Sequence, residues 1–322
     1  MGLFDLAAGN LISPPILFFA LGLLAALIRS DLVVPEAVAK ALSLYLVMAI
    51  GFKGGVEMGN ASLGSAALAV LAGIILSAAI PFVSYLLLRA TSRLDRVNVA
   101  AIAAHYGSIS VVTFIASSDA GLALGFAAAG FMVAVAAAME APAIFSGLVL
   151  AGRREGFGES RGNILAKVAV NGSIVLLIGS FAIGWATGDE GYAVTKPFFV
   201  DIFRGVLTLF LLDMGLVAGR GLLRQAKELR PAVVLHGLYM PLIGAALGLA
   251  AAWIIGLDAG KGALLMTLAA SASYIAVPAA MRLALPEAKP ALSLTLSLGV
   301  TFPFNLILGI PLYYAAAGVV LS

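Results

Sequence analysis

The sequence predicts an all-α protein that crosses a membrane many times, and three observations support that prediction. The chain of 322 residues is 62% hydrophobic. Only 11% of its residues are charged, whereas a soluble protein carries about 25%. Apolar segments of about 20 residues, the length that spans a bilayer as a helix, recur along the whole chain. We therefore expect a multi-pass membrane protein without a soluble domain.

Ten apolar segments are expected to be spanning helices. The first opens on Ser13-Pro14-Pro15, where a capping residue followed by proline suits a helix start. The links between the segments are short, and the longest polar one covers 152–163. The ten expected spans are 12–29, 36–52, 63–88, 97–117, 126–150, 164–187, 197–219, 231–255, 261–284 and 290–320.

Lysine and arginine residues distinguish the two sides of the membrane. They flank every odd-numbered link, whereas the even-numbered links and both termini hold few. Cytoplasmic loops carry the excess of positive charge, so the odd links are expected in the cytoplasm and both termini outside. The net charge of +3 reflects these loops and does not indicate nucleic acid. Met1–Asn10 has no lysine or arginine, so no cleavable signal peptide is expected. The cations on the outer side are Lys53, Lys196, Lys261 and Arg204.

The spans divide into two halves of five. Because five is an odd number, a duplicated unit would enter the membrane upside down the second time. The spacing of polar features supports such a duplication, since Ser108 precedes Pro142 by 34 residues and Ser271 precedes Pro303 by 32. We predict a 5+5 inverted repeat with a first unit over 1–152, a cytoplasmic link over 153–163 and a second unit over 164–322.

Small polar residues interrupt the fourth and ninth spans. Ser108 and Ser110 follow Gly107, and Ser271 and Ser273 repeat the same spacing. Residues two apart face different sides of a helix, so both hydroxyls of a pair can reach one pocket only where the helix unwinds. A half-helix that begins at such a break directs its positive end toward it, which suits a small anion. The alternative is close helix packing by small residues, and the two matching pairs favour a binding site.

Charged residues inside the spans are the next candidates, since each costs about 2.5–3.5 kcal/mol on insertion scales. Glu140 is the best candidate for a sodium ligand, because hard cations prefer oxygen. Lys53 and Asp213 are candidates for coupling or gating, although a snorkelling lysine and a structural ion pair are equally good interpretations. The chain has no cysteine and two distant histidines, so no transition-metal site is expected. The expected sodium-binding residues are Glu140, Thr113, Ser271, Thr301 and Asn305.

Six short motifs distributed over the whole chain share one pattern. They are Gly51-Phe-Lys-Gly-Gly55, His105-Tyr-Gly-Ser-Ile-Ser-Val-Val-Thr-Phe114, Met139-Glu-Ala-Pro-Ala143, Leu212-Asp-Met-Gly215, Ala270-Ser-Ala-Ser-Tyr-Ile-Ala-Val-Pro-Ala279 and Leu298-Gly-Val-Thr-Phe-Pro-Phe-Asn305. In this order they resemble the SbtA family of sodium-dependent bicarbonate transporters.

The resemblance implies a sodium-coupled symporter that imports bicarbonate by an elevator-like alternating access, with sodium as the coupling ion and no cofactor. It implies two crossed, broken helices (spans 4 and 9), a core domain moving against a gate domain, and a homotrimer in lipid in the bacterial inner membrane. It also implies a cytoplasmic PII-like regulatory protein that binds an adenine nucleotide. Substrate binding is assigned to Gly107, Ser108, Ile109, Ser110, Thr113, Ser271, Ala272, Ser273 and Tyr274.

Three other functions are compatible with the residues alone. A carrier of the same architecture could take another small anion, such as a carboxylate. A serine hydrolase could use Ser110 with His105 or His236, although no motif supports it and the second serine pair would have no role. A passive channel is the third. We expect a transporter and no enzyme.

Overall fold

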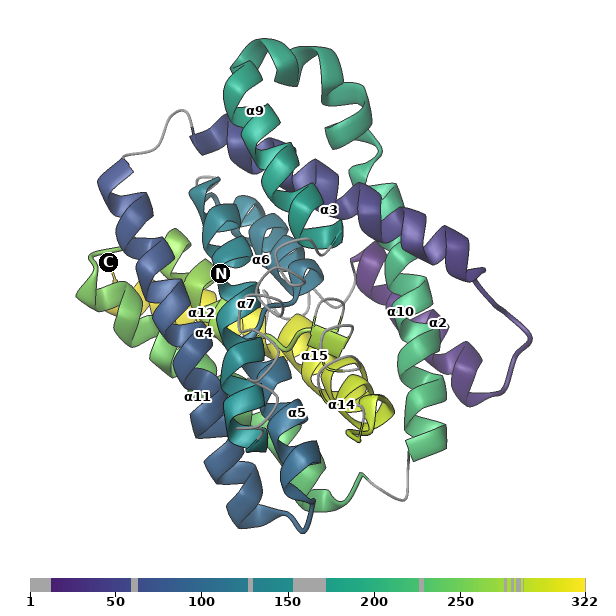
Figure 1. Cartoon of the computed structure of the whole chain (residues 1–322). Coiled ribbons are helices and arrows are strands. Elements are labelled where there is room, and N and C mark those ends of the chain that lie inside the picture. Colours follow the sequence, from purple (N-terminus) through teal and green to yellow (C-terminus); the bar gives the residue numbers. More distant parts are fainter. Residues whose placement is uncertain are drawn as a thin grey trace.

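The computed structural model describes residues 13–58, 63–126, 130–152, 172–225, 229–274 and 287–321, together with 277, 278, 281 and 285. Within this part of the chain every regular element is a helix (Figure 1). The first half contains α2 (Pro14–Leu27), α3 (Glu36–Met58), α4 (Leu63–Thr91), α5 (Arg96–Gly107), α6 (Val111–Ala123) and α7 (Phe131–Ala151). The second half contains α9 (Gly172–Lys196), the π-helix η2 (Pro197–Asp201), α10 (Phe203–Gln225), α11 (Pro231–Ile254), α12 (Ala259–Ala270) and an almost unbroken helical run over 290–320.

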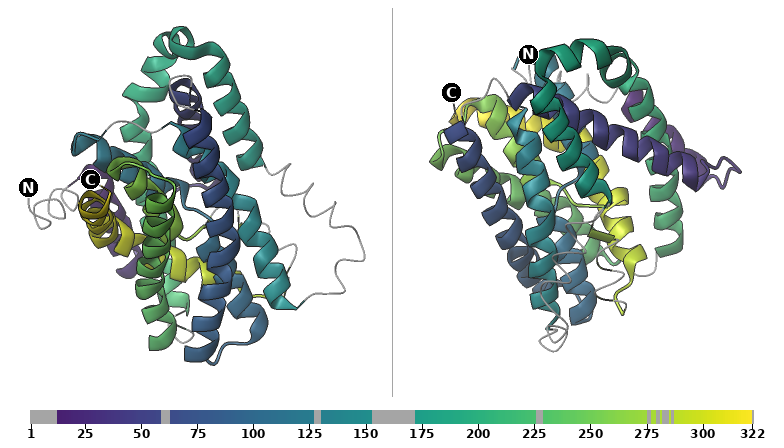
Figure 2. Two further views of the ribbon diagram at one scale, coloured as in Figure 1. Left: turned by 90° about the vertical axis from the view of Figure 1, so that its left-hand side faces the viewer. Right: turned by 45° about the horizontal axis from the view of Figure 1, so that its top comes forward.

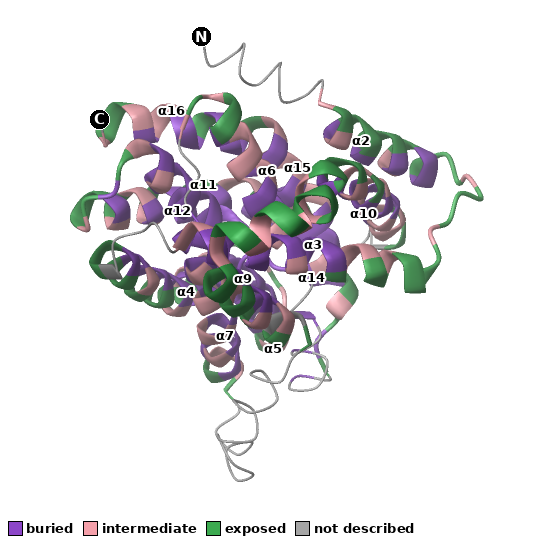
Figure 3. Ribbon diagram, turned by 90° about the horizontal axis from the view of Figure 1, so that it is seen from above, coloured by how far each residue is buried: buried purple, intermediate pink, exposed green. Residues whose placement is uncertain are grey.

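The helices have the dimensions and surface of a membrane protein. Seven segments of the described part are long and apolar enough to cross a membrane, and α2 and α12 are shorter apolar helices. Large side chains such as Leu86, Trp253 and Val175 are exposed, as contact with lipid requires. Buried residues gather at the centre of the molecule, seen from above in Figure 3. The all-α polytopic fold class is confirmed, whereas the ten-span inverted repeat remains a prediction.

The helices form two groups. α2, α3, α9, η2 and α10 pack mainly on one another, and we call them the peripheral group. The central group contains α4, α5, α6, α7, α11, α12 and the run over 290–320. Figures 1 and 2 show the peripheral helices along one flank of the molecule. The link predicted over 153–163 and residues 1–12 lie outside the described residues.

Glycine residues bring the peripheral helices into backbone contact. Gly22 of α2 lies against the Leu212 carbonyl of α10, and Gly184 of α9 lies against the Phe52 carbonyl of α3. A Cβ atom at either glycine would collide with that carbonyl. Small residues are what close helix packing in lipid requires. In the predicted repeat, α2 corresponds to α9 and α3 to α10, so this reciprocal pairing is consistent with an inverted duplication.

Gly188 bends α9 into two arms. Its φ of 54° and ψ of −147° are non-helical and lie in a region that favours glycine. Figure 1 shows the resulting arch at the top of the peripheral group. The predicted sixth span, 164–187, overlaps the first arm of α9, and its residues before 172 lie outside the described part.

The fourth span is a broken helix, as predicted. α5 ends at Gly107, Ser108 is extended (φ −93°, ψ 170°), and α6 begins at Val111. α12 likewise ends at Ala270, followed by an extended Ser271 (φ −83°, ψ 165°). Of the most apolar window within Arg96–Ala123, 89% is buried in protein. Irregular backbone at membrane depth is tolerated in such surroundings because protein groups, and not lipid, face it.

Candidate functional site

The two breaks lie in direct contact at the centre of the molecule. The Ser110 amide donates a hydrogen bond to the Ser271 hydroxyl at 2.9 Å. The Ser273 amide donates to the His105 carbonyl at 2.8 Å. The breaks are therefore joined in both directions, with each segment donating or accepting through its main chain. This is the crossing that the family resemblance implied.

The same local sequence builds both approaches to the crossing. α5 and α12 are each 12 residues long. Each begins directly after an aspartate, whose carboxylate accepts a hydrogen bond from the backbone amide three residues further along the chain. At Asp95 the donor is the Asn98 amide, and at Asp258 it is the Lys261 amide, each at 3.0 Å. Such N-caps fix where a helix begins. Equal lengths then place Ser108 and Ser271 at equivalent helix ends.

The backbone amides that follow the two extended serines are buried and have no acceptor among the described residues. Ile109 and Ala272 directly follow the extended serines and are 1% and 3% exposed. Neither amide donates a hydrogen bond to a described residue. Buried N–H groups are nearly always paired, so two at equivalent positions indicate a missing acceptor. A small anion between the breaks would supply it.

The first break also orders the start of α6. The Ser110 hydroxyl accepts hydrogen bonds from the Thr113 amide at 3.1 Å and from the Thr113 hydroxyl at 2.8 Å. The Ser271 hydroxyl, which accepts from Ser110, donates in turn to the Leu268 carbonyl at 2.9 Å. These bonds hold Ser110, Thr113 and Ser271 together, and they turn the N-terminus of α6 toward the crossing.

Glu140 brings a carboxylate to the first break. The Ser108 hydroxyl donates to Glu140 Oε2 at 2.7 Å, and Glu140 is 5% exposed. No described cationic side chain forms an ion pair with it. A buried carboxylate requires a counter-charge or a proton, so this oxygen pair is suited to a hard cation.

Ser77 of α4 positions Glu140 and was missed from the sequence. Its hydroxyl accepts from the Ala143 amide at 3.2 Å and donates to the Met139 carbonyl. Those two groups would bond to each other in an uninterrupted helix, so Ser77 is inserted into the hydrogen-bond ladder of α7 next to Pro142. The only sequence signal is a hydroxyl four residues before Pro81 of α4.

Thr301 and Asn305 lie in two π-helical turns, η3 (Ser297–Thr301) and η4 (Asn305–Gly309), on either side of the short α15 (Phe302–Phe304). The Thr301 hydroxyl donates to the Gly237 carbonyl at 2.9 Å, and Tyr106 donates to it at 2.7 Å. The Asn305 side chain donates to the last carbonyl of α12, Ala270, at 3.0 Å. Asn305 therefore reaches the second break, whereas Thr301 bonds to Gly237 and to Tyr106, a residue that the sequence did not single out.

The remaining predicted residues lie as follows. Gly107 packs against the Pro81 ring, which leaves no room for a side chain. Tyr274 is buried, and its hydroxyl lies close enough to the Ser110 side chain to interact with it. Lys53 lines a cavity next to the Phe203 ring. Asp213 lies on α10 and interacts electrostatically with Arg220 on the same helix.

Three cavities lie between the peripheral and central groups. Two are on the side predicted to face outward; they share Asp119 and Tyr314, and their volumes are about 80 and 540 Å³. A third, of about 290 Å³, lies toward the side predicted to be cytoplasmic and is lined by Tyr274. All three cavities thus lie along the boundary between the peripheral and central groups.

The serine–histidine pairs required for a hydrolase do not form at Ser110. His105 bonds to the Ala101 carbonyl at 2.7 Å. The two ring nitrogens of His236 contact the Ser84 and Tyr239 hydroxyls, each at 2.9 Å. In the described part of the chain, neither histidine therefore contacts the proposed nucleophile.

Comparison with known proteins gives one family. A family model described as the Na+-dependent bicarbonate transporter superfamily matches residues 14–318, which is nearly the whole chain. No match was found among the curated proteins.

Proposed function

The chain belongs to the Na+-dependent bicarbonate transporter superfamily, and we propose that it imports bicarbonate by sodium-coupled symport with alternating access. The observation that carries the proposal is that the Ile109 and Ala272 amides have no acceptor among the described residues, while the carboxylate of Glu140 bonds to Ser108, directly before Ile109. One small anion and one cation fit this arrangement. Transport of this kind needs no enzyme chemistry and no cofactor beyond the coupling sodium.

Bicarbonate would bind between the two breaks. Its oxygens would accept hydrogen bonds from the Ile109 and Ala272 amides and from the positive end of α6. Ser110 and Ser271 would hold these donors in place, because their hydroxyls already connect the two segments. The resemblance adds Gly107, Ser108, Thr113, Ser273 and Tyr274 to the substrate-binding residues.

Sodium would bind at Glu140. The Thr113 and Ser271 hydroxyls at the crossing would supply neutral oxygens, together with main-chain carbonyls at the ends of α5 and α12. Asn305 would act by holding the end of α12 through Ala270. Thr301, bonded to Tyr106 and Gly237, would act one step further from the ion.

Alternating access would come from an elevator-like movement of the central group against the peripheral group, as core and gate. The three cavities along their boundary support this proposal. A cross-link between the groups should stop transport. Gly221 of α10 and Thr295 of α14 (Pro290–Leu296) suit a disulfide, because a Cβ on Gly221 would lie 3.4 Å from that of Thr295.

The chain has no native cysteine, so a Gly221→Cys/Thr295→Cys variant would form one defined disulfide. Oxidation should abolish uptake and a reductant should restore it, with each single variant as the control. Full uptake by the oxidised protein would rule out movement along this boundary.

The family resemblance supports further proposals about the assembly. We place the protein in the bacterial inner membrane with both termini periplasmic or extracellular, as a homotrimer. A PII-like regulatory protein would bind on the cytoplasmic side. Asp213 would contribute to coupling through α10.

Uptake into proteoliposomes tests the function directly. Labelled bicarbonate should accumulate when an inward sodium gradient is imposed and should not accumulate when choline replaces sodium. Saturation of the rate would exclude a passive channel. Sodium-independent uptake, or none, would reject the proposal for this substrate. A thermal-shift screen of small carboxylates in sodium would then test the second candidate, a carrier for another small anion, which the same unpaired amides would accommodate.

A further inference from the structure

The smaller outward cavity lies beside α6, the helix that begins at the first break. It lies between α3 of the peripheral group and α6, α7 and α12 of the central group. Its wall includes Phe114 and Ile115, which directly follow Thr113 at the start of α6. We call this space of about 80 Å³ the outer vestibule. A water molecule needs about 10–15 Å³ of such volume, so the vestibule suits a small hydrated ion and excludes large solutes.

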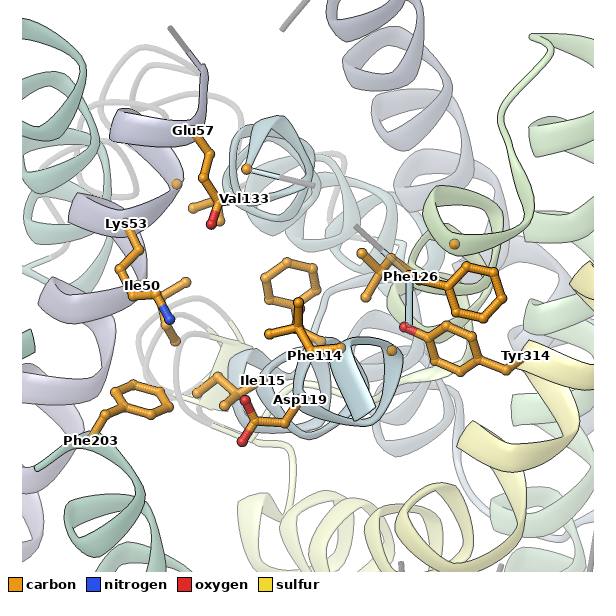
Figure 4. Close-up of a pocket in the computed structure, with 17 residues that line it drawn as sticks. Ile50, Lys53, Glu57, Phe114, Ile115, Asp119, Phe126, Val133, Phe203 and Tyr314 are labelled. Carbon is orange, nitrogen blue, oxygen red and sulfur yellow. The ribbon is translucent and has the colours of Figure 1, made fainter. Parts of the chain in front are cut away.

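Lys53 is the cation that points into the outer vestibule (Figure 4). Its ammonium lies 5.7 Å from the centre of the Phe203 ring. It makes no hydrogen bond or ion pair with any described residue. The aromatic face contacts the ammonium without neutralising its charge.

Neither carboxylate that faces Lys53 forms an ion pair with it, so its ammonium is available to bind an anion. Asp119, on the α6 wall, pairs with Arg204 at 3.5 Å. Glu57 lies one turn along α3 and attracts Lys53, but beyond ion-pair distance. The vestibule therefore presents one uncommitted cation and one uncommitted carboxylate, and Figure 4 shows both side chains directed into the same space.

We propose that Lys53 captures the transported anion in the outer vestibule before it reaches the breaks. The ligand is a small monovalent oxyanion, and this inference rests on the proposed function. The aromatic ring of Phe203 holds the ammonium without neutralising it. An anion released from Lys53 then meets the next positive potential at the N-terminus of α6. Lys53 is thus an affinity-setting residue that acts before the binding step at Ile109 and Ala272.

Charge restoration on a cysteine tests the proposal in this cysteine-free chain. Lys53→Cys should raise the KM for bicarbonate about tenfold, with the maximal rate within about twofold, because a charge-lined cleft acts on ion capture. Modification from outside with an aminoethyl methanethiosulfonate, which rebuilds a cation, should restore KM. The neutral methyl reagent and the anionic sulfonatoethyl reagent should not. Lys196→Cys, an exposed outer lysine on α9, is the matched control and should respond to none of them.

The outcomes separate this inference from the function on which it rests. If the unmodified protein takes up no bicarbonate, the proposed function fails. If it does, and Lys53→Cys keeps its KM or is restored equally by the neutral reagent, Lys53 has only a packing role. Should Lys53→Cys fail to reach the membrane, Lys53→Arg and Lys53→Met provide the same comparison. Arginine should then keep KM and methionine should raise it.

Discussion

The two helix breaks are built alike but carry different chemistry. Each follows a 12-residue helix with an aspartate cap, and each places an extended serine before an unpaired amide. At the first break, Ser108 donates to the carboxylate of Glu140. At the second, Ser271 donates to a main-chain carbonyl of its own helix, Leu268. The shared features are donors for an anion, and the difference is one negative charge.

The comparison separates the features of the site that a duplicated unit would contain twice from those that it would not. Main-chain donors follow from helix length and capping, so any copy of the unit would carry them. A carboxylate depends on one side chain, and the position that corresponds to Glu140 in the predicted repeat is Thr301. Thr301 bonds to Tyr106 and Gly237. One carboxylate and two donor sets suit a site that binds one cation beside one anion.

Removal of the charge at the first break should have the largest effect. Glu140→Gln keeps the shape and still accepts from Ser108, but it cannot balance a cation. Contacts to charged groups are worth about 1.5–3 kcal/mol, so uptake at a fixed sodium concentration should fall roughly 10–100-fold. The sodium dependence of bicarbonate uptake in proteoliposomes measures this.

The matched substitution is Thr301→Val, at the position that corresponds to Glu140 in the predicted repeat, and it should leave the sodium dependence within about twofold. An equal loss for both variants would show that the two breaks share the cation. That result would remove the asymmetry on which the comparison depends.

The serine hydroxyls at the crossing should come next. Ser271→Ala leaves the Ser110 amide without an acceptor, and Ser110→Ala leaves Thr113 unpaired. An unsatisfied buried group costs about 1–3 kcal/mol, so each variant should lose roughly tenfold or more of its uptake. Both should still insert and assemble, as size-exclusion chromatography in detergent would verify. Normal uptake by both variants would place the substrate elsewhere.

The two aspartate caps should give the smallest effect. Asp95→Ala and Asp258→Ala should each lower the free energy of unfolding by about 0.5–2 kcal/mol. The larger loss is expected for Asp95, because the Asn98 side chain that donates to it also accepts from the Lys289 amide, whereas the ion pair of Asp258 with the Lys261 ammonium is exposed and contributes little. Thermal unfolding in detergent measures the difference, and a larger loss at Asp258 would reverse the ranking.

The same caps have a defined pH dependence. Burial raises the pKa of Asp95, but hydrogen bonds from Asn98 outweigh it and lower the pKa below its ordinary value. The carboxylate therefore stabilises the fold above the unfolded pKa of about 3.9, and this stabilisation is lost as the pH falls through the lower folded value. The difference in the free energy of unfolding between the native chain and Asp95→Ala should be constant near neutral pH and should shrink in acid.

Local pattern was enough to predict the breaks. Gly107 with Ser108 and Ser110, and the second pair at Ser271 and Ser273, are incompatible with a lipid-facing helix, so their place in the fold followed from hydrogen-bonding needs. The fold class followed from composition and segment length. The number of spans stays a prediction, because length and hydropathy do not separate a short half-helix from a span.

Long-range partners were not predictable from the sequence. Ser77 meets α7 across 62 residues, and Tyr106 meets Thr301 across 195. Helical periodicity gives the face on which a hydroxyl lies but not the neighbour that packs there. Asp213 illustrates the converse, since a charge in an apolar segment indicated a site, but the side chain lies on α10 of the peripheral group and interacts with Arg220.

The glycine-to-carbonyl contacts of the peripheral helices have a mechanical consequence. Gly22 and Gly184 bring main chain against main chain, with no side chain between them to change rotamer. Attraction at such short range fades steeply within an ångström, and lipid offers no hydrophobic force to replace it. Each helix pair is therefore either in contact or separated, with few stable intermediate positions. We expect these four helices to move as one rigid unit. Bilayer stress would then displace the four helices together and leave their packing unchanged.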